Sequence, residues 1–290
     1  MSLVQALILG AVQGLTEFVP VSSTAHLFLT QALMGIPNDE ITLSFDIVLH
    51  LGTVAALIAS TRKELAAMLE EAMALLRREP ARDPTARALL APIVVGTIPG
   101  VLAGLFLLKR FEALRSIGLI GACMLVACAY FFFAEGVSAR RAAGNRALAD
   151  IDAADGVWIG TAQAAAGLLA GLSRSGFTIA TGKLRRFSRP DAARFSFLLA
   201  LPIILGAGAK ALLDLRKSPE PGPGRAVLLA GFAAAAVVGY VAIEVLLRFL
   251  RTHSLRPFAI YLGLLGLALV LASAFPGFLP FLPVSAILTP

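Results

Sequence analysis

The chain of 290 residues is 58% hydrophobic and 15% charged, and it carries a formal net charge of +7. With a mean hydropathy of +0.84, this composition excludes an ordinary soluble protein, whose surface needs more charged residues than the chain contains. The basic residues predict no nucleic-acid partner, because they cluster in loops between apolar segments, where membrane topology and anionic lipid account for them. We therefore expect a polytopic membrane protein.

In chain order, the first apolar region covers residues 3–34 and is interrupted by Pro20 and the polar run Ser22–Thr24. A second interrupted region covers residues 156–181 and breaks at Gly171–Gly176. Irregular backbone at membrane depth is tolerated only where protein or a water-filled cavity satisfies its polar groups. We therefore interpret both regions as re-entrant, broken helices whose breaks line a cavity.

Six further apolar stretches run without interruption, and each is long enough to cross a hydrocarbon core of about 30 Å. They predict an all-α fold with six transmembrane helices in a single membrane domain over residues 1–290. The six stretches lie near residues 42–60, 88–108, 116–134, 195–214, 226–250 and 257–275.

The two halves of the chain are predicted to be repeats, roughly residues 1–135 and 155–275. Each repeat holds one broken hairpin and three spans, and an odd number of crossings gives the two repeats opposite orientations in the membrane. Inverted repeats of this kind bring both hairpin tips to mid-membrane. A shift of 150 residues aligns Gly10 with Gly160, Gln13 with Gln163 and Ser23 with Ser173.

Loop charges predict the orientation of this arrangement. The four loops that share one face hold 17 Lys and Arg residues, against seven on the opposite face. Because basic loops stay on the cytoplasmic side, we expect both termini outside. The four basic loops are residues 61–87, 135–155, 180–195 and 248–256.

The first polar island begins with Gln13 and Glu17, which are four residues apart and share one helical face. They direct an amide and a carboxylate toward Ser22–His26. Burying a carboxylate without a counter-charge is costly, and Arg174 is the counter-charge if the two hairpins share a site. The alternative is a structural hydrogen-bonded pair.

Hydroxyl groups and an imidazole come next in the sequence, after Glu17. A helix that begins at Ser22, Ser23 and Thr24 would be capped by a hydroxyl and would point backbone amides at an anion. His26 is either a satisfied core residue or a catalyst. In the next span, Asp46 and His50 are four residues apart, as a hydrogen-bonded acid and imidazole would be, and could orient the site or relay protons.

The second island, GLSRSGFT, places Arg174 at the break of the second hairpin. Its planar, permanently charged guanidinium suits phosphate oxygens, and Gly171 and Gly176 permit close approach of the backbone. Elsewhere, Glu244 and Arg248 are predicted to form an ordinary interfacial ion pair near the end of a span.

With these residues in view, the chain resembles the bacterial undecaprenyl pyrophosphate phosphatase family, integral membrane enzymes associated with bacitracin resistance, over nearly its whole length. The family's first signature, Glu/Gln-x-x-x-Glu running into PVSST-x-H, is matched by Gln13, Glu17, Pro20–Thr24 and His26. The second, PG-x-SRSG-x-T, is matched by Gly171, Ser173–Gly176 and Thr178, with Ala170 in place of the proline.

The resemblance implies removal of the terminal phosphate from undecaprenyl pyrophosphate, which yields the monophosphate lipid carrier used in envelope polymer synthesis. It also implies a multi-pass protein of the bacterial inner membrane with a polyprenyl pyrophosphate lipid as substrate, and the topology predicts a site that opens to the periplasmic face. Phosphoryl oxygens need cationic stabilisation, which Arg174, a divalent cation (Mg²⁺ or Ca²⁺) and the hairpin amides could supply. Association into a homo-oligomer stays open.

Two mechanisms fit these residues. In the first, Ser23 attacks phosphorus while Glu17 or His26 takes its proton; in the second, Glu17 binds or orients a metal-activated water. The first is favoured, and the catalytic set is Glu17, Ser23, His26 and Arg174, supported by Asp46 and His50. The predicted substrate-binding residues are Gln13, Ser22, Thr24, Ser173, Ser175, Gly176 and Thr178.

Two other functions are weighed against this one. Inverted repeats with broken helices are also the architecture of secondary transporters, so a polyprenyl-phosphate flippase is the alternative. The dense set of ionisable and hydroxyl groups exceeds what lipid binding requires and favours the phosphatase. The unrelated lipid phosphatases with an SR-x5-H signature are disfavoured, because Ala180 lies near the place where their histidine would follow Arg174.

Overall fold

The computed structural model describes all residues except 38, 108–115, 141–144, 216–223 and 276–290. The described part is helical and contains no strand, only an isolated bridge between Arg146 and Phe187. Six helices are long and apolar enough to cross a membrane. The prediction of an all-α, multi-pass membrane protein with six spans is thus confirmed.

The six spans match the predicted stretches to within a few residues at most ends. In chain order they are α3 (Glu40–Ser60), α5 (Pro84–Phe106), α7 (Ile117–Ala139), α10 (Arg189–Leu215), α11 (Arg225–Thr252) and α12 (Arg256–Ala274). Three of them, α5, α10 and α12, begin on a proline or on the residue before one, where the missing amide is harmless in the first helical turn.

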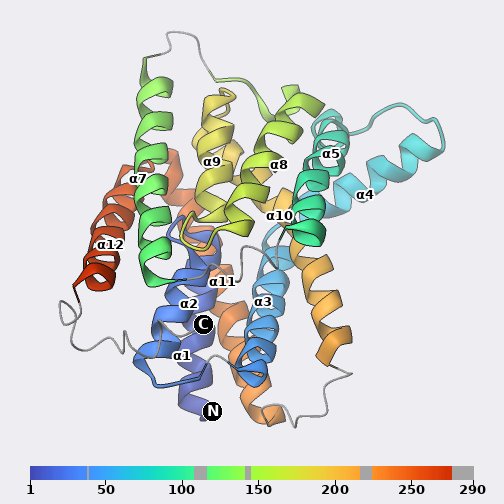
Figure 1. Cartoon of the computed structure of the whole chain (residues 1–290). Helices are drawn as coiled ribbons and strands as arrows, with labels where there is room; N and C mark the ends of the chain where they lie inside the picture. The colour runs from blue at the N-terminus through green and yellow to red at the C-terminus, as the bar shows by residue number, and fades with distance from the viewer. Residues whose placement is uncertain (38, 108–115, 141–144, 216–223, 276–290) are drawn as a thin grey trace.

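Both interrupted regions are helical hairpins, as predicted. The first consists of α1 (Leu3–Phe18) and α2 (Ser23–Leu33), and the second of α8 (Ala153–Leu168) and α9 (Arg174–Leu184). The longer helices, α1 and α8, have 16 residues each, so each rises about 24 Å and is shorter than a full span. In Figure 1 the two hairpins occupy opposite halves of the bundle, and their tips lie near its mid-height.

Glycines let each hairpin pack closely on a span of the other half. A Cβ on Gly10 of α1 would lie 2.5 Å from the carbonyl oxygen of Gly231 in α11. In the same way, a Cβ on Gly160 of α8 would lie 2.1 Å from the carbonyl oxygen of Gly96 in α5. Such contacts allow close packing in lipid, where the hydrophobic effect does not drive helices together.

The predicted loop 61–87 contains a further helix, α4 (Arg62–Leu76). Its buried Glu71 accepts hydrogen bonds from the amides of Asp83 and Arg82, both at 2.8 Å, and from the Arg87 guanidinium at 2.7 Å. These donors hold the pKa of Glu71 below its usual range, because each favours the ionised carboxylate. Glu71 thereby fastens α4 to the start of α5.

Candidate active site

The tips of the two hairpins share an unusual backbone. Ser22 (φ 72°, ψ 90°) precedes α2 and Ser173 (φ 62°, ψ 97°) precedes α9, so both caps lie at positive φ, where side chains are rarely accommodated. Gly171 also has a positive φ, of 106°. Strain of this kind costs about 1–3 kcal/mol per residue and is found mainly at functional sites. Both tips are therefore candidate functional segments.

Direct hydrogen bonds join the tips. The amide of Gly171 donates to Ser22 Oγ at 3.1 Å, and Ser175 Oγ donates to the carbonyl oxygen of Val19 at 3.4 Å. A Cβ at Gly171 would lie 2.4 Å from the carbonyl oxygen of Ile120, so glycine permits the close approach to α7. The structure thus brings the two polar islands, about 150 residues apart in sequence, into one site.

Glu17, at the end of α1, is the centre of this site. Its Oε1 accepts a hydrogen bond from Arg174 Nη2 at 2.7 Å, and the two side chains form an ion pair. Its Oε2 accepts from Ser23 Oγ at 2.7 Å and from Gln13 Nε2 at 3.0 Å. One buried carboxylate therefore contacts an amide, a hydroxyl and a guanidinium from both hairpins.

Two buried atoms beside Glu17 have no hydrogen-bond partner in the described part of the protein. They are Arg174 Nη1, a donor, and Gln13 Oε1, an acceptor. Leaving a buried polar atom unpaired costs about 1–3 kcal/mol, so each points to a group that binds there. A donor and an acceptor flanking a hydroxyl suit a phosphate group with a proton or a cation.

The amino-terminal ends of two helices add positive electrostatic potential to the site. Both α2, which begins at Ser23, and α9, which begins at Arg174, start at the joined tips. A helix amino terminus carries about half a positive charge and free backbone amides, which attract anions. The hydroxyl of Ser173 caps α9 by accepting from the amide of Gly176 at 3.3 Å, whereas Ser22 makes no such bond to α2. The first-turn amides of α2 thus remain without a side-chain cap.

His26 lies one turn into α2, and both of its ring nitrogens have partners other than Ser23. Its Nδ1 donates to the carbonyl oxygen of Ser22 at 2.8 Å, so in the neutral ring Nε2 is unprotonated. That Nε2 lies 2.6 Å from the hydroxyl of Tyr261 in α12, and the two rings stack at 5.6 Å. The sequence prediction missed Tyr261, which is 235 residues from His26; a lone tyrosine hydroxyl in an apolar span was the available signal.

The predicted supporting pair lies beside the site with a different hydrogen-bonding pattern. His50 Nδ1 is 2.8 Å from the main-chain oxygen of Asp46, and its Nε2 is 3.9 Å from Glu17 Oε2. The carboxylate of Asp46 accepts from Gln31 Nε2 at 2.7 Å. His50 thus faces Glu17, whereas Asp46 connects α3 to α2 through Gln31, another residue that the sequence prediction missed.

The remaining predicted binding residues divide by exposure. Ser175, Gly176 and Thr178 are buried, and the hydroxyl of Thr178 lies 2.5 Å from that of Ser196 in α10. A Cβ on Gly176 would lie 2.0 Å from the ring of Phe131, so this glycine lets α9 pack on α7. Thr24 is the exposed member of the set. The buried members hold the second hairpin in place around Arg174.

The site offers a small number of ligands for a divalent cation. Within the described ranges, three or more His, Cys, Asp and Glu side chains do not gather into a metal cluster. Glu17 and the unpaired Gln13 Oε1 nevertheless offer two oxygen ligands. Mg²⁺ usually takes one or two carboxylates and completes its shell with water and substrate phosphates, so the pair fits such an ion.

Comparison with known proteins finds relatives that match nearly the whole chain. The chain is 39% identical over 262 residues to a protein of Rubrobacter xylanophilus, covering 90% of this chain and 94% of that protein. It is 38% identical over 280 residues to one of Thermomicrobium roseum (95% and 99%) and 40% identical over 268 residues to one of Geobacter sulfurreducens (92% and 96%). All three are named undecaprenyl-diphosphatase.

The match of the family model reaches from the first turn of α1 into the last span, α12. The family is described as bacitracin resistance protein BacA, and its model aligns with residues 6–268. Because the alignment covers most of the chain, the resemblance seen in the two signature motifs is confirmed. This protein belongs to the BacA family of bacitracin resistance proteins.

Proposed function

We propose that this protein is an undecaprenyl-diphosphatase, a membrane hydrolase that converts undecaprenyl diphosphate to undecaprenyl phosphate and inorganic phosphate. Its similarity over nearly the whole chain to relatives with that name supports the activity. The observation that carries the proposal is the Glu17 carboxylate, which contacts the hydroxyl of Ser23 and the guanidinium of Arg174 at 2.7 Å each. A base, a nucleophile and a cation therefore meet at one buried point.

The site binds the terminal phosphate by charge. Arg174 Nη1, which is buried and unpaired in the described structure, donates to a phosphoryl oxygen while Nη2 stays on Glu17. The uncapped amides at the start of α2 face the same group. Donors held in place before the reaction stabilise the charge that develops on phosphoryl oxygens in the transition state, which is often the largest catalytic effect.

Ser23 is the nucleophile in this proposal, and Glu17 is its base. As Ser23 Oγ attacks the terminal phosphorus, its proton passes to Glu17 Oε2, and the bond between phosphorus and the bridging oxygen breaks. Undecaprenyl phosphate leaves, and water then hydrolyses the phosphoserine to phosphate. Glu17 is favoured over His26 as the base because His26 Nε2 faces Tyr261.

A divalent cation would be held by Glu17 and Gln13 Oε1. The cation would offset the negative charge on the phosphoryl oxygens. The mechanism with a metal-activated water in place of Ser23 remains the alternative. The relatives' names do not support the flippase function.

The location of the reaction follows from the proposed topology. The polyprenyl chain stays in lipid while the diphosphate reaches the hairpin tips, which lie near the mid-height of the bundle (Figure 1). The excess of basic loops supports an orientation with both termini outside, so the site opens to the outer face of the bacterial plasma membrane.

Substitution of the two charged groups tests the proposed function. Phosphate release from undecaprenyl diphosphate in detergent is expected to fall at least about 100-fold in Glu17→Gln and in Arg174→Ala, because each loses a charge at the reacting group. Arg174→Lys keeps a point charge and should retain partial activity. Glu70→Gln, on the exposed surface of α4, is the control. Near-normal turnover by monodisperse Glu17→Gln or Arg174→Ala would refute this site.

A separate experiment tests the nucleophile. Ser23→Ala is expected to lose turnover about as completely as Glu17→Gln, because the hydroxyl that bonds Glu17 is gone. Rapid acid quench of the wild type with a ³²P-labelled terminal phosphate should trap radioactive phosphoserine at Ser23, identified by peptide mass spectrometry. Turnover by Ser23→Ala at the wild-type rate would instead assign the attack to water.

A further inference from the structure

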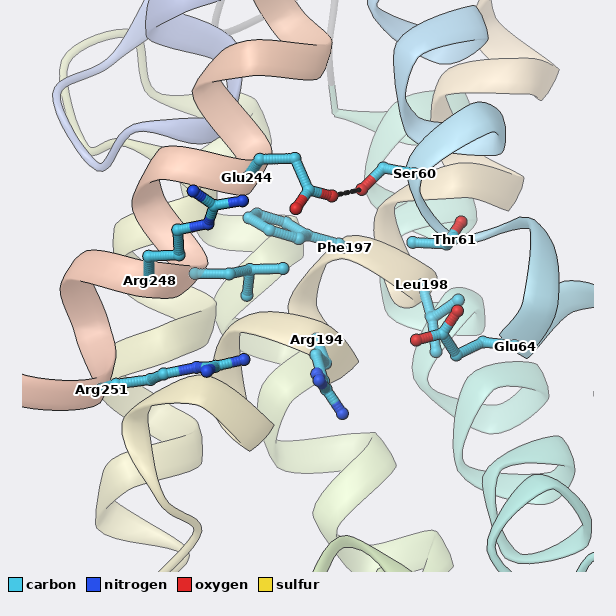
Figure 2. A pocket seen from close by; sticks show the side chains of 10 residues that line it. Ser60, Thr61, Glu64, Arg194, Phe197, Leu198, Glu244, Arg248 and Arg251 are labelled. Carbon is cyan, nitrogen blue, oxygen red and sulfur yellow. Dashed lines mark hydrogen bonds between the residues drawn. The ribbon is translucent and has the colours of Figure 1, made fainter.

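A cavity of about 410 Å³ lies apart from the hairpin tips, where the end of α3 and the start of α4 meet α10 and α11. Its volume is within the range of pockets that bind small molecules. Figure 2 shows side chains from all four helices pointing toward it. The cavity belongs to the face that carries the basic loops, because α4, the start of α10 and the end of α11 adjoin those loops.

Three arginines line this cavity without a protein partner. Arg194 comes from α10, and Arg248 and Arg251 come from α11. In the described ranges none of the three makes an ion pair or a side-chain hydrogen bond. Arg185 and Arg189, at the same end of the protein, instead contact the buried carboxylates of Asp155 and Glu135. All three are exposed to solvent, and their guanidinium groups are therefore accessible to an anion that enters the cavity.

Two carboxylates, Glu64 and Glu244, also line the cavity, and in the described structure neither forms an ion pair with its arginines. Glu244 accepts a hydrogen bond from Ser60 Oγ at 3.1 Å and does not form the predicted ion pair with Arg248, so that prediction was wrong. Figure 2 shows Glu244 and Ser60 along one edge, with Arg194 and Arg251 along the opposite edge. Three guanidinium groups and two carboxylates leave a formal excess of one positive charge in the lining, and Arg194 and Arg251 form its arginine edge.

An aromatic pair separates this cavity from the active site. Phe197 lines the cavity, and its ring makes an edge contact with that of Phe18, at 5.5 Å between centroids. Both rings are fully buried, and Phe18 follows Glu17 in the sequence. The cavity is thus close to the active site, yet it is a distinct place with its own charges.

We propose that the arginine edge of this cavity binds a phosphate group. Guanidinium groups donate paired hydrogen bonds to phosphate oxygens, and Arg194 and Arg251 present two such groups without protein partners at this edge. The ligand is either inorganic phosphate or the headgroup phosphate of an anionic phospholipid. Inorganic phosphate as the ligand rests on the proposed function, which releases it. A phospholipid headgroup as the ligand is independent of that function.

The test compares Arg194→Gln/Arg251→Gln with Arg256→Gln, an exposed arginine at the start of α12 that lies outside the cavity. Phosphatidylglycerol binding to the full-length protein is measured by native mass spectrometry. Inorganic phosphate binding is measured by ³¹P NMR line broadening with Arg174→Ala as the background, so that the active site does not contribute. Neither assay needs turnover, so failure of the proposed phosphatase activity would leave both arms interpretable.

The double variant is expected to bind one of the two ligands at least about tenfold more weakly, because two charge-assisted contacts are lost. Arg256→Gln should keep wild-type affinity. A loss for phosphatidylglycerol identifies a lipid headgroup site, and a loss for inorganic phosphate identifies a site for the product. Equal binding of both ligands by the double variant and the wild type, or an equal loss in Arg256→Gln, would overturn the proposal.

Discussion

Glu17 organises the active site because its two oxygens face different partners. Oε1 meets Arg174 from the second hairpin, and Oε2 meets Ser23 and Gln13 from the first. A buried carboxylate is stable only with compensating hydrogen bonds and charge, and here these come from the same groups to which the proposed mechanism gives roles. Arg174 Nη1 has no protein partner, so in the proposed mechanism the pair with Glu17 and the contact with phosphate do not compete.

Tyr261 is expected to position His26, and its hydroxyl can be removed without its ring. Tyr261→Phe keeps the stacking on His26 but loses the hydrogen bond to Nε2. We expect kcat to fall roughly fivefold with little change in KM, since one hydrogen bond is worth about 1 kcal/mol. The ¹⁵N resonance of His26 Nε2 should also move. Tyr240→Phe, in α11, is the matched control, and an unchanged His26 spectrum would contradict the assignment.

At the scale of helices, small residues decide how the hairpins are held. In α1, Gly10 and Gly14 face α11, and in α8, Gly156 and Gly160 face α5. A Cβ atom added at any of these four glycines would lie within 2.6 Å of a backbone oxygen, a distance that real Cβ atoms essentially never show. The short helices therefore pack against full spans by backbone contact, which fixes the position of the tips within the bundle.

Gly160→Ala tests this contact. The added methyl group would overlap the carbonyl of Gly96, so the free energy of unfolding is expected to fall by about 1–3 kcal/mol. Gly167→Ala, in the same helix, has no heavy atom within 4 Å of the new Cβ and should leave stability equal or slightly higher. Thermal unfolding of both variants in detergent measures the difference. Equal midpoints would show that α8 moves away from α5 without penalty.

For the molecule as a whole, the two hairpins have related roles but different chemistry. Ser22 and Ser173 occupy the same cap position at similar φ and ψ, so the tips align with a shift of 151 residues rather than the 150 expected from the sequence. With this alignment Ser23 corresponds to Arg174, the first residue of each second helix. One hairpin thus contributes the acid and the hydroxyl group, and the other contributes the cation.

The orientation of the whole molecule is a prediction that cysteine labelling can test. Pro37→Cys lies in the exposed segment after α2, and Arg77→Cys lies in the exposed segment after α4. With both termini outside, a membrane-impermeant maleimide should label Pro37→Cys in intact spheroplasts and Arg77→Cys only after permeabilisation. The wild type, whose Cys123 and Cys128 both lie within α7, measures background labelling. The reverse pattern would contradict the orientation.

The sequence by itself determined the number of spans and the two breaks. Apolar runs of about twenty residues and their interruption at Ser22–Thr24 and Gly171–Gly176 reflect local transfer energies, which depend on composition and not on neighbouring helices. The residue types at the breaks also indicated phosphate chemistry, because carboxylate, hydroxyl and guanidinium groups are rarely buried without a use.

Only the tertiary structure decided which of these groups meet and how. The Glu17–Arg174 pair joins residues 157 apart, and the His26–Tyr261 contact joins residues 235 apart. The cavity at Arg194, with its unpaired guanidinium groups, depends on four helices. Contacts at such separations come from the packing of helices against one another, and the local patterns of a single sequence do not encode the directions of the side chains that result.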